Sequence, residues 1–188
     1  SDLPENDEAD RRITYQLYGG DINTRMQQEI VLGIGGVRAL AAVGLKPTVW
    51  HINEGHAAFQ ILERCREAVA QGLDFDSALE LVAANTVFTT HTPVPAGNET
   101  FDRKLVRKHL EPWIRDVGCE PDELLGLGAD NGNFNMTAFS IRLAARTNGV
   151  SRLHGEVSSA MWRHLFPDGG AEPVGYVTNG VHTASWVG

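Results

Sequence analysis

The sequence predicts an α/β fold, an open, mostly parallel, Rossmann-like sheet with flanking helices. Short β-branched runs alternate with stretches in which apolar residues recur at helical spacing, a pattern typical of βαβ units. The 188 residues are 42% hydrophobic and 21% charged, a composition that supports a folded core. No internal repeat or low-complexity linker divides the chain, so we expect a single α/β domain at 21–188 after a polar leader at 1–20.

The first half of the chain predicts an alternation of helices and strands. The leader ends in Tyr18-Gly19-Gly20 and could enter the sheet as a strand. Asp21 can cap a long helix to Val43, in which the glycines of Gly33-Ile-Gly-Gly36 indicate close packing of another backbone or a break. Apolar patterning then predicts a strand at 47–53, helices at 55–71 and 77–84 (the second capped by Asp74 or Asp76), and a strand at 86–90.

The second half begins with the Pro93–Asn98 loop, whose prolines and glycine exclude regular structure. Beyond it, the pattern predicts short helices at 102–110, 121–126 and 135–146, a strand at 149–153, a helix at 154–165 and a last strand at 174–177.

Charge and composition exclude several classes of partner. The net charge is -8, from 24 acidic and 16 basic residues, and no basic cluster could follow a phosphate backbone, so we expect no nucleic acid. No apolar run approaches the roughly 20 residues of a membrane helix, and the acidic start is not a signal peptide. We therefore expect a cytoplasmic protein without a membrane partner, in which Cys65 and Cys119 are reduced thiols.

Polar side chains follow each predicted strand. They are Asn53, Glu54 and His56 after the first strand, His91 after the second, His154 after the third and Asn179 after the last. Because functional groups gather beyond the carboxyl ends of parallel strands, we expect these residues near one edge of the sheet. Uncharged donors and acceptors suit a ligand rich in hydroxyl groups, so the pattern favours a sugar site, although each residue alone could equally be structural.

Other chemistries fit the sequence less well. A zinc site is disfavoured because His51 and His56 flank an irregular turn and lack the one-face spacing of a zinc-binding helix. The glycine cluster does not follow a strand, so it lacks the context of a dinucleotide fingerprint. Cys65 lies on an apolar helix face and is a poor nucleophile candidate. Glu54 and Glu156 could form a glycosidase pair only at a separation that sequence cannot supply.

Five segments resemble the α-glucan phosphorylases, the family of glycogen, starch and maltodextrin phosphorylases, in its short bacterial branch. They are His51-Ile-Asn-Glu-Gly-His-Ala-Ala-Phe59, Thr89-Thr-His-Thr-Pro-Val-Pro-Ala-Gly-Asn-Glu-Thr-Phe101, Asn135-Met-Thr-Ala-Phe139, Asn148-Gly-Val-Ser-Arg-Leu-His-Gly-Glu-Val157 and Val177-Thr-Asn-Gly-Val-His-Thr-Ala-Ser-Trp186. The resemblance implies a two-lobed glycosyltransferase of the GT-B type, of which this chain is a central piece in the N-terminal lobe.

The resemblance also implies roles for single residues. His154 matches a histidine that holds the glucosyl unit near its 6-hydroxyl, and His91 matches one that lines the glucan cleft. Asn53, Glu54 and His56 match the cleft wall, and Asn179-Gly180 matches a turn near the crossing between lobes, although Asn-Gly also makes a tight turn without any ligand. The family's pyridoxal phosphate is held by a lysine of the C-terminal lobe, and none of Lys46, Lys104 and Lys108 lies in a matching segment.

The expected activity of the parent enzyme is reversible phosphorolysis of terminal α-1,4-linked glucose, with glucan and phosphate as partners and glucose 1-phosphate as product. The isolated chain is expected to be inactive, free of cofactor and of metal, and to self-associate through the face that a second lobe would cover. Two alternatives stay open. One is a non-catalytic glucan-binding piece, and the other is a nucleotide-sugar glycosyltransferase of the GT-B type, which is disfavoured because its glycine-rich loop is not visible.

Overall fold

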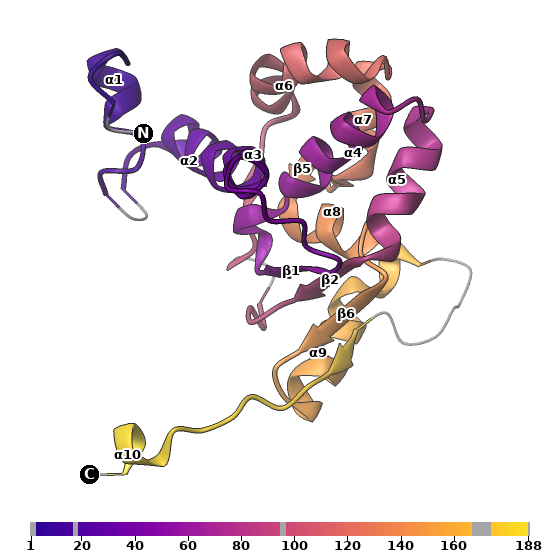
Figure 1. The fold of residues 1–188 in the computed structure, drawn as a ribbon. Helices are drawn as coiled ribbons and strands as arrows, with labels where there is room; N and C mark the ends of the chain where they lie inside the picture. The colour runs from indigo at the N-terminus through magenta and orange to yellow at the C-terminus, as the bar shows by residue number, and fades with distance from the viewer. Residues whose placement is uncertain (1–2, 17–18, 95–96, 167–173, 188) are drawn as a thin grey trace.

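A four-stranded parallel sheet forms the centre of the computed structural model, which describes residues 3–16, 19–94, 97–166 and 174–187. Its strands are β1 (Trp50–Asn53), β2 (Thr86–Thr89), β6 (Arg146–Gly149) and β7 (Gly175–Tyr176), in the spatial order β1-β2-β6-β7 (Figure 1). All three pairings are parallel. The predicted α/β class with a parallel sheet is therefore confirmed.

Helices precede, connect and follow the strands of the main sheet. They are α1 (Glu8–Arg11), α2 (Ile22–Ile30), α3 (Gly36–Ala42), α4 (Gln60–Ala70), α5 (Phe75–Ala84), α6 (Arg103–Val117), α7 (Pro121–Leu127), α8 (Met136–Arg142), α9 (Arg152–Trp162) and α10 (Thr183–Trp186). A second, antiparallel sheet of order β3-β5-β4 joins Thr100–Phe101, Asn133–Asn135 and Ala129–Asp130. Among the described residues, no helix has both the length and the apolar character that crossing a membrane requires.

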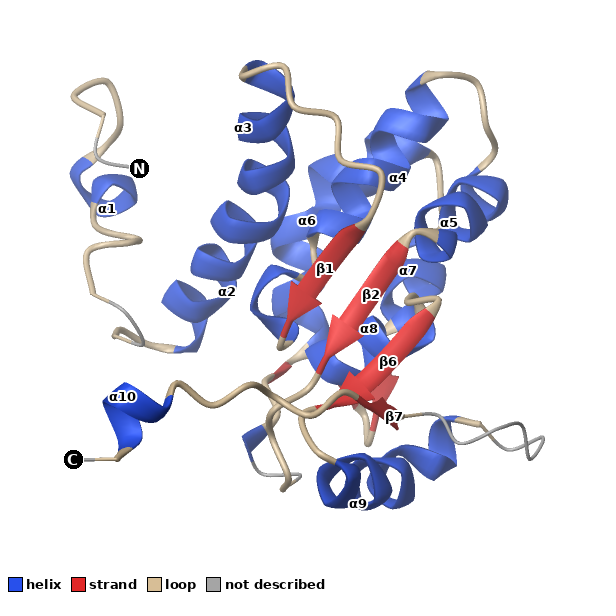
Figure 2. Ribbon diagram, turned by 60° about the horizontal axis from the view of Figure 1, so that its bottom comes forward, coloured by secondary structure: helices blue, strands red, loops and turns tan. Residues whose placement is uncertain are grey.

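The two faces of the main sheet have different environments. In Figure 2, α4, α5 and α8 lie behind the sheet and its other face is turned toward the viewer. Successive side chains of a strand point to opposite faces. Ile52 and its partner in register, Phe88, are fully buried, whereas His51, Asn53 and Arg146 are exposed. Parallel sheets are usually covered on both faces. The described residues leave one face of this sheet open.

The long predicted helix is present, and both interpretations of its glycines hold. Asp21 caps it, because the Asp21 carboxylate accepts a hydrogen bond from the Thr24 N–H at 2.8 Å. The α-helical path is interrupted by a π-helical turn, Val31–Gly35, between α2 and α3. At Gly33 a Cβ atom would lie 2.8 Å from the Gln60 nitrogen, so the backbone of α4 packs directly against this turn.

Some predicted elements are wrong or displaced. The third strand does not span 149–153 but 146–149, because the Ser151 hydroxyl accepts the His154 N–H and caps α9 instead. The described part of the leader forms the short helix α1 and no strand, and Tyr18 lies outside the described residues. So do Pro95 and Ala96 of the predicted loop. The small antiparallel sheet and α10 were not predicted.

Candidate functional site

The residues that follow β1 and β2 form a hydrogen-bonded group at the carboxyl edge of the sheet. The His91 ring donates from Nε2 to Asn53 Oδ1 at 2.8 Å. Glu54 accepts hydrogen bonds through Oε1 from the His91 backbone N–H and from the Thr92 hydroxyl, the latter at 3.1 Å. These contacts fix the start of the loop after β2 against the end of β1, and they leave the His91 side chain at the surface.

Glu54 has a strained backbone. Its φ of 60° and ψ of 179° lie in a region that non-glycine residues rarely adopt, at a cost of about 1–3 kcal/mol. The Glu54 N–H still continues the parallel ladder by donating to the Thr89 carbonyl at 2.9 Å. Gly55 then lets the chain pass close to α8, since a Cβ at this position would lie 2.8 Å from Met136 Cβ. The close packing of Gly55 against α8 and the hydrogen bond from Glu54 to β2 therefore hold Glu54 in this conformation.

A row of polar side chains crosses the open face of the sheet next to this group. The Thr89 hydroxyl donates to Asn148 Oδ1 at 3.1 Å and accepts from His51 Nε2 at 2.7 Å. The row thus joins the second residue of β1, the last residue of β2 and the third residue of β6. Polar side chains that can donate or accept hydrogen bonds therefore continue from the carboxyl edge of the sheet onto its open face.

His154 and Asn179 lie beyond β6 and β7 in different environments. The His154 side chain, 8% exposed, accepts the Val150 N–H at Nδ1 (3.2 Å), so its ring proton lies on Nε2. That Nε2 atom is buried without a hydrogen-bond partner among the described residues. Asn179 is exposed, and its backbone N–H donates to the Val150 carbonyl at 3.0 Å. Only Asn179 of the two presents its side chain to solvent.

His56 belongs to a different group, a network of charged residues beneath the carboxyl edge. Its Nδ1 atom lies 3.4 Å from Glu99 Oε2 and 3.9 Å from Glu29 Oε1. Arg25 holds Glu99 with two hydrogen bonds, at 2.7 and 2.9 Å, and lies 3.4 Å from Glu29 Oε1. Glu29 is 1% exposed, whereas His56 is half-buried. We call Arg25, Glu29, His56 and Glu99 the charged network.

Burial and neighbouring charges shift the pKa values of the charged network in different directions. Burial raises the pKa of Glu29 to about 8, so this carboxyl is protonated at neutral pH. Hydrogen bonds with Glu29 and Glu99 raise the pKa of His56 to about 9. Although burial opposes it, hydrogen bonds with His56, Glu29 and Arg25 hold the pKa of Glu99 below its ordinary value. At neutral pH, two cations therefore face one carboxylate.

The charged network also contains the described residues that could hold a metal ion, since one ligand atom each of Glu29, His56 and Glu99 lies within 4.8 Å of the others. A metal would have to displace Arg25 from Glu99. It would also need an ionised Glu29 and a neutral His56, the reverse of their states at neutral pH. The arrangement favours an ion-pair network over a metal centre.

A pocket of about 330 Å³ connects the charged network to the carboxyl edge, and its lining includes Glu54, His56, Thr92 and Glu99. Its lining combines the charged side chains of Arg25, His56 and Glu99 with the hydroxyl and amide groups of Thr92, Thr137 and Asn98. Sequence reasoning missed Arg25, Glu29 and Glu99. The only local signal was the i, i+4 spacing of Arg25 and Glu29 on a predicted helix, which marks a pair but not its partners.

Comparison with known proteins gives close matches over the whole chain. No protein-family model matches. The chain is 48% identical over 202 residues to a glycogen phosphorylase of Mycobacterium tuberculosis, covering 99% of this chain and 23% of that protein. It is 45% identical over 189 residues to a maltodextrin phosphorylase of Thermococcus litoralis (100% and 22%), and 36% identical over 192 residues to a glycogen phosphorylase of Aquifex aeolicus (100% and 28%). The chain thus spans about a quarter of the length of these relatives.

Proposed function

The chain is a homologue of one segment of the glycogen and maltodextrin phosphorylases, and we propose that it forms part of the glucan site of such an enzyme. The reaction of the whole protein is reversible phosphorolysis of terminal α-1,4-linked glucose to glucose 1-phosphate. The observation that carries the proposal is the hydrogen-bonded group of Asn53, Glu54 and His91 at the carboxyl edge. This edge is where open α/β sheets bind ligands.

His91 is the residue that we assign to the sugar. Its Nε2–H is fixed on Asn53, so the ring is oriented, and Nδ1 is left as an acceptor for a sugar hydroxyl. Asn179, exposed beyond β7, is the second contact that we assign, through its side-chain amide. His154 is buried and its Nδ1 is occupied by Val150, so we assign it a structural role in place of the substrate contact suggested by the resemblance.

Glu54 and the charged network position these groups. Glu54 accepts from the His91 backbone and from Thr92, so it holds the loop that carries the histidine. The charged network closes the pocket behind Glu54 through His56 and Glu99. We infer that the binding groups themselves are uncharged and that the ionised groups act on the sugar only by shaping the wall of its site.

Pyridoxal phosphate does not fit the residues of this chain. Lys46, Lys104 and Lys108 are all exposed, and none borders the pocket at the carboxyl edge. A lysine that forms a Schiff base requires a site that lowers its pKa. We therefore derive no step through the cofactor, and we propose that the remainder of a longer, two-lobed protein supplies it together with the phosphate site.

The open face of the sheet supports the proposal that other segments of a longer protein complete the site. Parallel sheets are normally covered on both faces, yet His51, Asn53 and Arg146 are exposed here. The chain spans only 22–28% of its relatives. We infer that further segments of a longer protein cover this face, that the isolated chain self-associates through it, and that the isolated chain is catalytically inactive.

The test is maltoheptaose binding to the 188-residue chain, measured by isothermal titration calorimetry. His91→Ala should weaken binding about 10-fold or more, because the variant loses one oriented hydrogen bond to a sugar hydroxyl. His109→Ala is the matched control. His109, on α6, makes the same kind of imidazole–amide contact, because its Nε2 atom lies 2.8 Å from Oδ1 of Asn23 on α2.

His154→Ala separates the two histidines. It should lower the midpoint of thermal unfolding and leave the affinity of the folded chain for maltoheptaose nearly unchanged. Equal affinities for wild type and His91→Ala would overturn the assignment of His91. Tighter binding of a nucleotide sugar than of maltoheptaose would favour the glycosyltransferase alternative.

A further inference from the structure

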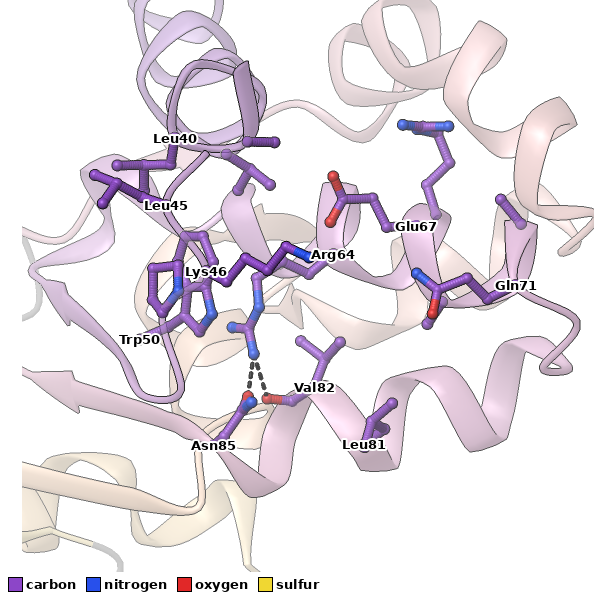
Figure 3. Close-up of a pocket in the computed structure, with 16 residues that line it drawn as sticks. Leu40, Leu45, Lys46, Trp50, Arg64, Glu67, Gln71, Leu81, Val82 and Asn85 are labelled. Carbon is purple, nitrogen blue, oxygen red and sulfur yellow. Dashed lines mark hydrogen bonds between the residues drawn. The ribbon is translucent and has the colours of Figure 1, made fainter. Parts of the chain in front are cut away.

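A second pocket lies at the opposite end of the sheet from the candidate site. It has a volume of about 650 Å³ and lies between the end of α3, the outer side of α4 and the end of α5 (Figure 3). Trp50, the first residue of β1, and Asn85, which precedes β2, are among its lining residues. The pocket therefore opens at the amino ends of these strands, and the proposed glucan site does not use it.

Arg64 enters the pocket from α4 and is 6% exposed. Its guanidinium group donates to the Thr86 hydroxyl at 2.9 Å and to the amide oxygen of Gln60 at 3.3 Å. It also donates to the Val82 carbonyl at 3.2 Å and to the amide oxygen of Asn85 (Figure 3). The Arg64 Cζ atom lies 4.7 Å from the centre of the Trp50 ring. Each of these partners is uncharged, so they fix the orientation of the guanidinium without neutralising it.

The charge of Arg64 lacks a carboxylate partner within salt-bridge distance in the described part of the chain. Neighbouring Arg66 and Arg38 differ, since both pair with Glu63, at 2.7 and 2.8 Å. The last carbonyls of α5 supply only a partial negative charge. Burial lowers the pKa of Arg64 to about 10, which indicates that its environment disfavours the cation. An anion in the pocket would relieve this cost.

A second cation lies in the same pocket. The Lys46 side chain extends past Trp50 toward Arg64, as Figure 3 shows, while Glu67 lies on the other side of Arg64. Apolar side chains complete the wall, among them Leu40, Leu45 and Leu81. The lining thus combines Lys46 and Arg64 with an apolar surface, and it also includes the carboxylate of Glu67 and Arg66, which is paired with Glu63. The volume of the pocket is within the range of small-molecule sites.

We propose that this pocket binds a small organic anion, whose phosphate or carboxylate group lies between Arg64 and Lys46 and whose apolar part packs on the leucines. Hydrogen bonds from both terminal nitrogens to protein oxygens hold Arg64 in place before the ligand arrives. Arg64 would therefore act on the anion through its positive charge and its remaining Nε–H donor. Lys46, at the rim, supplies the second charge.

The experiment titrates the 188-residue chain with inorganic phosphate, acetate and hexanoate by calorimetry at constant ionic strength. Phosphate and acetate separate the two anionic groups, and hexanoate tests the apolar wall. We expect saturable binding of phosphate or of the carboxylates, with hexanoate bound more tightly than acetate. Lys46→Met should weaken binding about tenfold, the equivalent of one charge-assisted hydrogen bond, whereas Lys104→Met, which removes an exposed lysine from α6, should leave it unchanged.

Trp50 locates the ligand independently, because its fluorescence should change on binding and this change should disappear in Trp50→Phe. A substitution at buried Arg64 could prevent folding, and for that reason Lys46→Met is the variant that tests the site. Absence of saturable binding, equal affinities in Lys46→Met and Lys104→Met, or a fluorescence response that persists in Trp50→Phe would each overturn the proposal. None of these results depends on glucan binding, so the proposed function stands or falls separately.

Discussion

Replacement of Glu29 by glutamine should change how the stability of the chain depends on pH. Glu29 is 1% exposed, and burial raises its pKa from 4.5 to about 8. A carboxyl group whose pKa is higher in the folded state contributes its full stability below the unfolded value, and loses it as pH rises through the folded value. Stability from Glu29 should therefore fall continuously from mildly acidic pH to about pH 9.

The size of the effect follows from the two pKa values. Between about pH 6.5 and pH 9, Glu29 is ionised in the unfolded chain, whereas in the folded chain it loses most of its proton over this range. Integration of the difference in bound protons gives a loss of about 2 kcal/mol. The amide of Glu29→Gln has no proton to lose, so the variant lacks this loss. Because Glu29 also raises the pKa of His56, titration of His56 adds to the loss in wild type and acts in the same direction.

The assay is urea denaturation of wild type and Glu29→Gln at about pH 6.5 and pH 9. The free energy of unfolding of wild type relative to the variant should fall by about 2 kcal/mol between the two pH values. Glu111→Gln, which changes an exposed carboxylate on α6, serves as the control and should show no such difference. A constant difference between wild type and Glu29→Gln would refute the reasoning, since Glu29 would then already be ionised in the folded chain at about pH 6.5.

Further substitutions test three local features by thermal or urea unfolding. Asp74→Ala should cost about 1 kcal/mol, because Asp74 accepts the Ser77 N–H at 2.9 Å as the cap of α5, and an unchanged midpoint would remove that role. Gly33→Ala should cost about 1–3 kcal/mol through its 2.8 Å approach to backbone, whereas Gly35→Ala, in open space, should not; equal effects would contradict this packing. Glu54→Gly should be more stable than Glu54→Ala by about 1 kcal/mol if the φ of 60° is strained, and the reverse order would exclude strain.

The parts of the fold that local chemistry determines were predictable from the sequence. Asp21 caps its helix as expected, and Asp74, one of two candidates, caps the next. The β-branched runs at 47–53 and 86–90 contain β1 and β2. Strand β6 was misplaced because Arg-Thr-Asn-Gly has no apolar pattern of its own, and it becomes a strand by pairing with β2 and β7. Pairing of this kind is a tertiary effect that a pattern along the chain does not record.

The candidate site also has a part that was predictable from the sequence and a part that was not. The rule that parallel strands end at one edge brings Asn53, Glu54 and His91 together from positions far apart in the chain, as expected. The charged network was not predictable, since Glu29 and Glu99 come from a helix and a loop that meet only in the folded chain. His56 was singled out for a sugar site on sequence grounds, yet the carboxyl groups of Glu99 and Glu29 lie 3.4 and 3.9 Å from its Nδ1 atom. The pattern located the residue but not its surroundings.

Burial distinguishes two histidines that the sequence treats alike. His91 and His154 each follow a strand of the same parallel sheet, and both lie in segments shared with α-glucan phosphorylases. An imidazole can bind a ligand only through a ring nitrogen that is accessible, and its orientation must be fixed before the ligand arrives. The His91 ring meets both conditions through Asn53 and its exposed position, whereas the His154 ring uses Nδ1 to hold Val150 and buries Nε2. Homology therefore identifies the kind of protein, and hydrogen bonding and burial decide which of its residues we assign to the ligand.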